Sequence, residues 1–124
     1  MKLILTLFFL ATILIGCSSA DAEFNSMSST EAYELISSDS DVIVLDVRSE
    51  AEFLTGHIEG SILLPIDEIE DLANDVLLNQ DSTILVLCQS GNRSRIASQT
   101  LANLGFKNVY DIGGIINWPG EIVD

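Results

Sequence analysis

The segment from Thr83 to Ser94 constrains the fold most, because an apolar run passes directly into a short polar loop that contains a glycine. Residues 84–87 are Ile-Leu-Val-Leu, without the polar alternation of a half-exposed strand, which is typical of a strand buried in a parallel sheet. The segment therefore predicts a buried central strand that leads into a loop and then a helix, as in an α/β domain.

Cys88 stands where this strand ends, at the start of the loop. The free N–H groups of a tight loop and a helix N-terminus attract anions, so a thiol placed there ionises below its free pKa of about 8.5. Gly91 supplies a residue that can adopt positive φ, and Arg93 adds a positive charge at the mouth. The loop is thus predicted to hold a reactive thiolate in an anion-binding cradle.

The rest of the chain alternates helix and strand signals. Capping patterns at Ser28-x-x-Glu31 and Ser49-x-x-Glu52 predict helices that run through about Ile36 and Leu54. Three strands are predicted besides the central one, at residues 41–47, 61–64 and 108–111. Two longer helices are predicted from apolar stripes, one on Ile66, Ile69, Leu72, Ala73, Val76 and Leu77, and one on Ile96, Ala97, Thr100, Leu101 and Leu104, which Gly105 would end.

Four motifs in this order resemble the rhodanese, or sulfurtransferase, family. They are Asp46-Val47-Arg48, Gly56-His57-Ile58-Glu59-Gly60, Cys88-x-x-Gly91-x-Arg93-Ser94 and Gly113-Gly114-Ile115-Ile116-Asn117-Trp118. The resemblance extends over roughly residues 28–123, which amounts to one single-domain rhodanese. One departure is Ser61, where the family often has alanine after the glycine. The resemblance implies a rhodanese-like domain over residues 28–124, an α/β fold with a central, mainly parallel sheet flanked by helices on both faces.

The resemblance also implies a chemistry. Loops of six residues, counted from the cysteine to the arginine, carry sulfur in such families, and longer loops take phosphate or arsenate; Cys88 to Arg93 is the six-residue form. A sulfurtransferase is therefore expected, which moves a sulfane sulfur from thiosulfate or a similar anionic donor to cyanide or a thiol through a Cys88 persulfide. No metal or organic cofactor is implied. The expected substrate-binding residues are Gln89, Ser90, Gly91, Asn92, Arg93 and Arg48, and the expected supporting residues are Asp46, His57 and Ser94.

Several alternatives stay open. The chain could be a non-catalytic rhodanese-like interaction module, or, less in keeping with the short loop, a phosphatase or arsenate reductase that uses the same cysteine. His57, the only histidine, invites a general-base role, but a thiolate needs no base and the resemblance gives this segment a supporting role. Arg48 could bridge to Glu52 four residues on instead of binding substrate, and Arg93 could tie the loop to Asp46. Trp118 with the Gly113-Gly114 turn is expected to close the core.

The charge of the chain and its cysteine content limit the partners and metal ions that it could bind. The chain of 124 residues carries 19 acidic and 5 basic residues, a formal charge of −14, which argues against a nucleic-acid partner. It has only 2 cysteines and 1 histidine, too few for a structural zinc site. A single domain, expected to be a monomer, fits this length.

The N-terminus has the features of a targeting segment. Met1-Lys2 is followed by an apolar run over residues 3–15, too short to span a membrane comfortably, since a spanning helix needs about 20 residues. Leu14-Ile15-Gly16-Cys17 resembles the bacterial lipobox. We therefore expect a cleaved signal peptide over residues 1–16, acylation of Cys17, a tether over residues 17–27, and a lipid-anchored protein of the bacterial cell envelope on the extracytoplasmic side. The alternative is an uncleaved anchor with Cys17 as an ordinary apolar residue.

Overall fold

The computed structural model describes residues 21–124 as one α/β domain, so the expected signal peptide and the lipidation site Cys17 lie outside the described residues. The helices are α1 (Ser29–Ser38), α2 (Glu50–Leu54), α3 (Ile69–Val76) and α4 (Asn92–Asn103), with short 3-10 turns η1 (Ile66–Glu68) and η2 (Ile115–Asn117). The strands are β1 (Asn25–Ser26), β2 (Ile43–Asp46), β3 (His57–Ile58), β4 (Ile62–Leu63), β5 (Thr83–Cys88), β6 (Asn108–Gly114) and β7 (Ile122–Val123).

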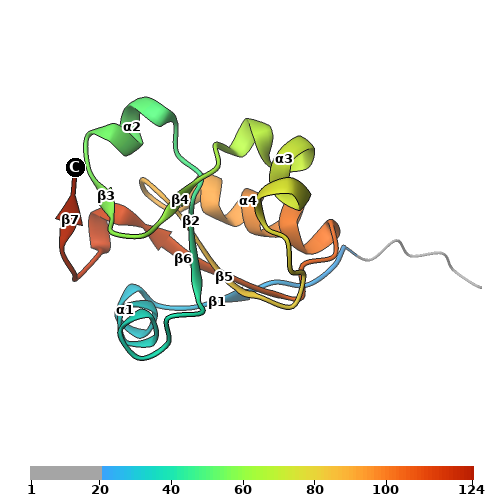
Figure 1. The fold of residues 1–124 in the computed structure, drawn as a ribbon, viewed down its shortest axis with the longest axis horizontal. Coiled ribbons are helices and arrows are strands. Elements are labelled where there is room, and N and C mark those ends of the chain that lie inside the picture. The colour runs from blue at the N-terminus through green and yellow to red at the C-terminus, as the bar shows by residue number, and fades with distance from the viewer. Residues whose placement is uncertain (1–20) are drawn as a thin grey trace, which may run out of the picture.

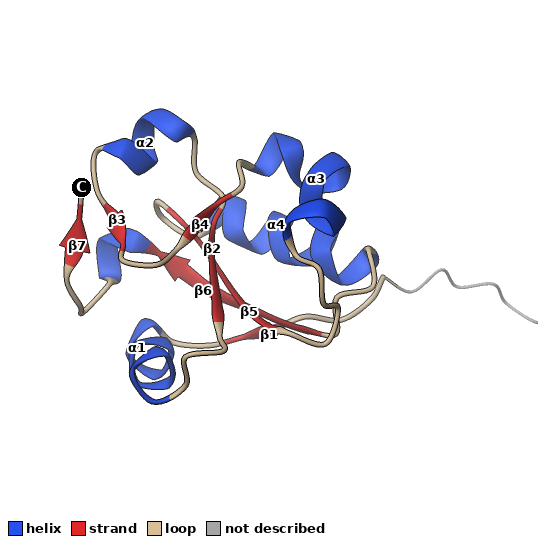
Figure 2. Ribbon diagram, viewed as in Figure 1, coloured by secondary structure: helices blue, strands red, loops and turns tan. Residues whose placement is uncertain are grey.

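Five strands form the central sheet in the order β1-β6-β5-β2-β4, and every neighbouring pair in it is parallel. The helices lie on both sides of these strands (Figure 2). This confirms the predicted fold class. Because all the strands run the same way, the carboxyl ends of β2 and β5 meet at one edge, where ligands bind in open sheets of this type.

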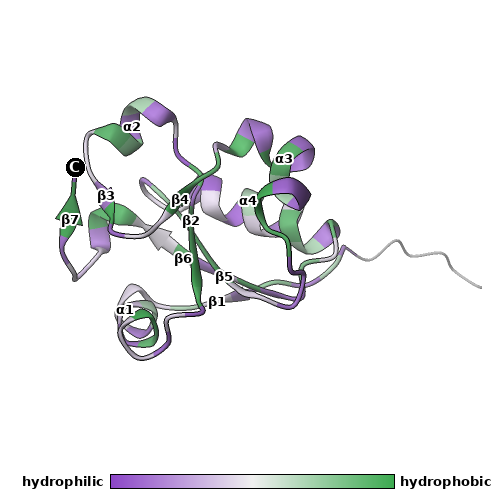
Figure 3. Cartoon of the chain, viewed as in Figure 1, coloured by the Kyte–Doolittle hydropathy of each residue, from purple (hydrophilic) through white to green (hydrophobic). Residues whose placement is uncertain are grey.

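The two faces of β5 belong to two separate cores. Ile84, Val86 and Cys88 point into a cluster with α3 and α4, whereas Leu85 and Leu87 point into a second cluster with α1. Figure 1 shows α3 and α4 on the side of the sheet away from α1, and Figure 3 shows apolar colour along the central strands. The unbroken apolar run from Ile84 to Cys88 in β5 is thus explained by burial on both faces.

The N-terminal boundary differs from the expected tether over residues 17–27. Asn25 and Ser26 form β1, which pairs with Tyr110 and Asp111 of β6. Phe24 and Met27 on either side of β1 pack against the two cores. The polar composition of this segment concealed the strand, because the pairing depends on main-chain hydrogen bonds and only two apolar side chains. The domain therefore begins before residue 28.

Two helices also depart from the predicted pattern. The predicted helix from Ile66 is divided into η1 and α3, and Leu72 and Val76 are 38% and 39% exposed instead of facing the core. On α4, Ile96 is 51% exposed, and Ser94 and Ser98 take part in the buried face beside Ala97 and Leu101. Small serines allow this helix to lie close to the sheet, so the buried face contains polar residues that an apolar stripe does not reveal.

A small antiparallel pair lies apart from the main sheet and was not predicted. β3 pairs with β7, so that His57 faces Val123 and Ile58 faces Ile122. The pair joins residues more than sixty positions apart, and strands of two residues are too short to leave a pattern in the sequence. Within residues 21–124, no helix is long and apolar enough to cross a membrane.

Candidate active site

The loop after β5 has the geometry of a cradle. Cys88 is the last residue of β5, and its side chain is buried, with 1% of its surface exposed. Gly91 adopts φ of +109° and stands immediately before α4, whose first residue is Asn92. In this conformation the Gly91 N–H donates to the Cys88 sulfur at 3.0 Å. A side chain at residue 91 would strain that turn, since positive φ disfavours residues other than glycine.

The surroundings of Cys88 stabilise its thiolate. Burial raises the pKa of the thiol, but hydrogen bonds from the Ser94 hydroxyl and from the N–H groups of Ser94, Gly91 and Ser90 lower it further than burial raises it. The result is a pKa below the usual value for cysteine, as the sequence predicted. The N–H groups at the start of α4 thus act as the anion site, and a larger thiolate fraction makes the sulfur a better nucleophile near neutral pH.

Arg93 lies at the mouth of the loop, but its partner differs from the predicted Asp46. Its two terminal nitrogens reach the two carboxylate oxygens of Glu52 on α2, at 2.6 and 2.8 Å. This fork geometry lowers the pKa of Glu52 to about 2 and raises the pKa of Arg93. Because Glu52 also closes the capping box of α2 with Ser49, the arginine is tied to a fixed carboxylate.

Arg48 does not bridge to Glu52 and is 3% exposed. Its guanidinium lies against the carboxylate of Asp46, with Nη2 at 2.8 Å from Oδ2, and also donates to the carbonyl of Gly56 at 2.7 Å. The other terminal nitrogen of Arg48, Nη1, lies 3.5 Å from the Gln89 side-chain oxygen Oε1. The predicted substrate contact therefore has little geometric support, and Arg48 instead connects Asp46 at the end of β2 to Gly56 and to Gln89 of the loop.

Strand β6 supports the loop from the other side. A register shift beside Val86 and Leu87 brings Gly114 opposite Cys88. At Gly114 a side-chain carbon would stand 2.4 Å from the Gln89 carbonyl oxygen, which is too close for any residue but glycine. The Gly113-Gly114 pair was expected to close the core, and the structure instead places Gly114 directly against the active loop.

Asp111 is a site residue that the sequence analysis missed. It lies on β6, and its Oδ1 accepts hydrogen bonds from the Ser94 hydroxyl at 2.7 Å and from the Gly113 N–H at 3.0 Å. Ser94, predicted as a supporting residue, is fully buried between Asp111 and the loop. A carboxylate on a strand beside the cysteine strand could have been noticed from topology, since Asp111 of β6 pairs with Val86 and Asp46 of β2 pairs with Leu87.

The other predicted residues differ in their exposure. The side chains of Gln89, Ser90 and Asn92 are exposed at the loop, where they are accessible to a small anion. His57 stacks on Phe53, with ring centroids 3.9 Å apart, and its Nδ1 lies 3.1 Å from the Phe53 carbonyl. These contacts belong to the α2–β3 corner and give His57 a supporting place in the fold.

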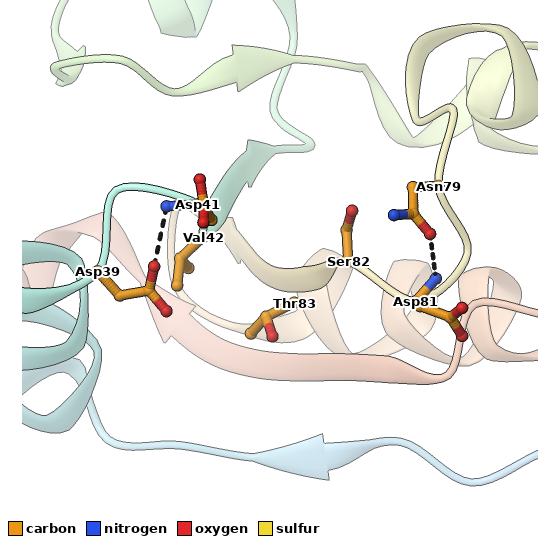
Figure 4. A pocket seen from close by; sticks show the side chains of 7 residues that line it. All are labelled: Asp39, Asp41, Val42, Asn79, Asp81, Ser82 and Thr83. Carbon is orange, nitrogen blue, oxygen red and sulfur yellow. Dashed lines mark hydrogen bonds between the residues drawn. The ribbon is translucent and has the colours of Figure 1, made fainter.

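A separate pocket of about 450 Å³ lies at the opposite end of the sheet, where β2 and β5 begin. Figure 4 shows its lining, in which Asp39 and Asn79 each accept a hydrogen bond from a backbone N–H two residues on. Asp41 and Asp81 add further carboxylates. Because these residues lie where β2 and β5 begin, the pocket is remote from Cys88 at the end of β5. In residues 21–124, no cluster of three or more histidine, cysteine or acidic side chains is arranged to hold a metal ion.

Comparison with known proteins identifies the fold and the loop together. The sequence model of the rhodanese-like domain matches residues 28–121, which include the strand, the cysteine loop and the supporting strand β6. The chain belongs to the rhodanese-like family. A crystal structure of a rhodanese-related protein from Thermoplasma volcanium superposes with a TM-score of 0.69 at 34% identity, covering 81% of this chain and 98% of that one.

Two curated relatives of this rhodanese-like chain have sulfur-related names. It is 36% identical over 106 residues to the putative sulfur carrier protein YrkF of Bacillus subtilis, covering 84% of this chain and 56% of that protein. It is also 36% identical over 93 residues to the thiosulfate sulfurtransferase GlpE of Ectopseudomonas mendocina, covering 75% of this chain and 82% of that protein. The chain thus spans only about half of the first relative and most of the second. These likenesses support a sulfurtransferase of the rhodanese family.

Proposed function

We propose that this protein transfers sulfane sulfur through a persulfide on Cys88, with thiosulfate or a similar anion as donor. The observation that carries the proposal is the buried sulfur, held 3.0 Å from the Gly91 N–H within a six-residue loop. Hydrogen bonds lower the pKa of that thiol although it is buried. A relative named thiosulfate sulfurtransferase, 36% identical over 93 residues, adds support for the donor.

The reaction has two steps. In the first, the Cys88 thiolate attacks the outer sulfur of thiosulfate, a new S–S bond forms, and sulfite departs with the electron pair of the bond that breaks. The outer sulfur of the persulfide then carries the negative charge. In the second step, cyanide or a thiolate attacks that outer sulfur and Cys88 leaves as a thiolate. No oxidant or reductant enters either step.

The described residues supply what these steps need. The N–H groups of the loop favour the negative charge of the thiolate before attack and when Cys88 leaves. Arg93 gives the mouth a cation, although Glu52 already holds both of its terminal nitrogens. A donor with a compact, negatively charged end is therefore favoured over a phosphoryl group, which presents three equatorial oxygens to be bound at once.

The intact mass of the full chain, before and after exposure to thiosulfate, tests the proposal. The wild-type chain should gain the mass of one sulfur atom and lose it on addition of cyanide. The Cys88→Ala variant, treated in the same way, should gain no sulfur. Hydrolysis of a phosphate monoester by the wild-type chain, lost in the same variant, would instead favour the phosphatase alternative. If no sulfur donor adds mass and no ester is hydrolysed, the interaction module becomes the better description.

We also propose that the protein is held at a membrane by acyl chains on Cys17, on the extracytoplasmic side of a bacterial cell. The support is the sequence alone: an apolar run over residues 3–15 followed by Leu-Ile-Gly-Cys. Metabolic labelling with a fatty-acid analogue should mark the wild-type chain and not a Cys17→Ser variant. Label that persists in the variant, or a mature protein that retains residues 1–16, would contradict this anchor.

A further inference from the structure

The hydroxyl of Ser94 has more acceptors around it than it has protons. It is fully buried, and its oxygen lies 2.7 Å from Oδ1 of Asp111 and 3.0 Å from the carbonyl of Gly91. A serine hydroxyl donates a single hydrogen bond. A bond to a carboxylate is stronger than a bond to a neutral carbonyl, so Asp111 is the preferred acceptor while the nearby sulfur is uncharged.

Cys88 becomes a third acceptor once it ionises. The Ser94 hydroxyl and the Cys88 sulfur both contact Gly91: the hydroxyl lies 3.0 Å from its carbonyl oxygen, and its N–H lies 3.0 Å from the sulfur. The hydroxyl is therefore close to the sulfur, and in keeping with this Ser94 is one cause of the lowered pKa of the Cys88 thiol. The same proton cannot serve the carboxylate and the thiolate fully at the same time. Asp111 is itself held in place, because its Oδ1 also accepts the N–H of Gly113 at 3.0 Å.

We propose that Asp111 is a positioning residue that holds the Ser94 hydroxyl proton while the sulfur of Cys88 is uncharged, and yields it to that sulfur when Cys88 becomes a thiolate. The proposal rests on the sulfur transfer proposed above and assigns a role to a residue outside the cysteine loop. Asp111 touches neither donor nor acceptor and acts only through Ser94.

The change of acceptor for the Ser94 hydroxyl, from Asp111 to the Cys88 sulfur, would occur in the second step of sulfur transfer. In the persulfide the charge lies on the outer sulfur, and the inner sulfur is neutral. When a thiolate acceptor attacks the outer sulfur, a new S–S bond forms, the bond to Cys88 breaks, and its electron pair passes to the inner sulfur. The Ser94 hydroxyl then rotates toward this new charge without giving up its proton. An interaction that forms only as the charge develops lowers the barrier of the step.

Other charged groups around the loop set the background for this exchange. Arg93 from α4 favours the thiolate, but Glu52 from α2 holds both of its terminal nitrogens. The pair of Arg48 and Asp46 at the end of β2 is internally neutral. Asp111 from β6 forms no ion pair in the described part of the chain, so no cation there offsets its negative charge.

The pH dependence of alkylation at Cys88 tests the proposal on the full chain. Iodoacetamide reacts with the thiolate, and the mass of the peptide that contains Cys88 reports its modification separately from that of Cys17. Asp111→Asn keeps the shape and the acceptor oxygen but removes the charge and weakens the competing hydrogen bond. Both changes favour the thiolate, so we expect the midpoint of the profile to fall by about one pH unit.

Ser94→Ala, alone and combined with Asp111→Asn, separates competition from simple charge. Removal of the hydroxyl should raise the midpoint, and should raise it more in the Asp111→Asn background, where the thiolate no longer competes with a carboxylate. An unchanged or higher midpoint in Asp111→Asn overturns the proposal. Equal effects of Ser94→Ala in both backgrounds also overturn it, because Asp111 would then act as a charge alone.

The readout stays informative if the variants differ in stability or if sulfur transfer fails. Circular dichroism at each pH identifies any variant that does not fold, and Ser94→Ala alone must still raise the midpoint in the otherwise unchanged chain. Alkylation requires no sulfur donor. A shifted midpoint without any gain of sulfur would therefore support the role of Asp111 and reject the proposed function. A gain of sulfur without a shifted midpoint would support the proposed function and reject the role of Asp111.

Discussion

Replacement of Gly114 by alanine should damage catalysis through the geometry of the loop. The added carbon would stand 2.4 Å from the Gln89 carbonyl oxygen and 2.7 Å from the Cα of Ser90. Such contacts are not found below 3.0 Å, so the loop must move by at least 0.6 Å, the difference between 3.0 and 2.4. Both neighbours are backbone atoms, and no flexible side chain can absorb the displacement.

The expected effect is larger on rate than on stability. A misplacement of about 1 Å can cost about a hundredfold in rate, so a shift of this size should slow formation of the Cys88 persulfide by about tenfold. Overpacking of this kind costs about 1–3 kcal/mol of stability. Gly114 has φ of −103°, which alanine adopts freely, so none of the effect arises from backbone strain.

Gly60→Ala is the matched control. Gly60 has φ of +78°, and a side-chain carbon there would meet no atom within 4 Å. Alanine should therefore cost about 1–2 kcal/mol through strain alone, and leave the loop undisturbed. Persulfide formation measured by intact mass, with stability measured by urea denaturation, compares the two variants. The reasoning is refuted if Gly114→Ala reacts at the wild-type rate, or if both variants slow equally.

Three ion pairs lead to further predictions. Because the carboxyl of Glu52 has its pKa lowered from 4.5 to about 2, the stability that it gains from Arg93 should be fully present above pH 4.5 and disappear as the pH falls toward 2. Since both side chains are about one-third exposed, Glu52→Gln should cost only about 1 kcal/mol at pH 7, and a difference in urea stability that persists at pH 2 would contradict this origin. Asp46→Asn should cost about 3 kcal/mol, because it leaves the buried Arg48 without a countercharge. Asp81→Asn, in an ion pair that is 71% exposed on each side, should cost less than about 0.5 kcal/mol, and equal losses in these two variants would show that burial does not govern them.

The sequence predicted those features that depend on local chemistry. The buried strand that ends at Cys88, the positive φ of Gly91 and the end of α4 before Gly105 each follow from one short stretch of residues. The capping box of Ser49 and Glu52 was also confirmed. In each of these cases, the residues that determine the conformation are neighbours in the chain.

Features that depend on distant segments were harder to predict. Neither of the pairings that the sequence left open for the two arginines is formed, since Glu52 is near Arg48 in sequence but pairs with Arg93. Asp111 was missed because its partner Ser94 lies 17 residues earlier, on a different element. Spacing in the sequence indicates which charges can meet on one helix, and says little about charges that the topology brings together.

The sheet has its shortest strands at its margins. β1 and β4 have two residues each, whereas the apolar six-residue β5 is central, with a neighbour on both sides. An exposed strand edge can recruit strands from other molecules, and a very short one offers few free hydrogen-bonding groups for this. Removal of residues 21–27 would leave the seven-residue β6 at the margin, where copies of the chain could pair. The two residues of β1 therefore help to protect this protein against aggregation.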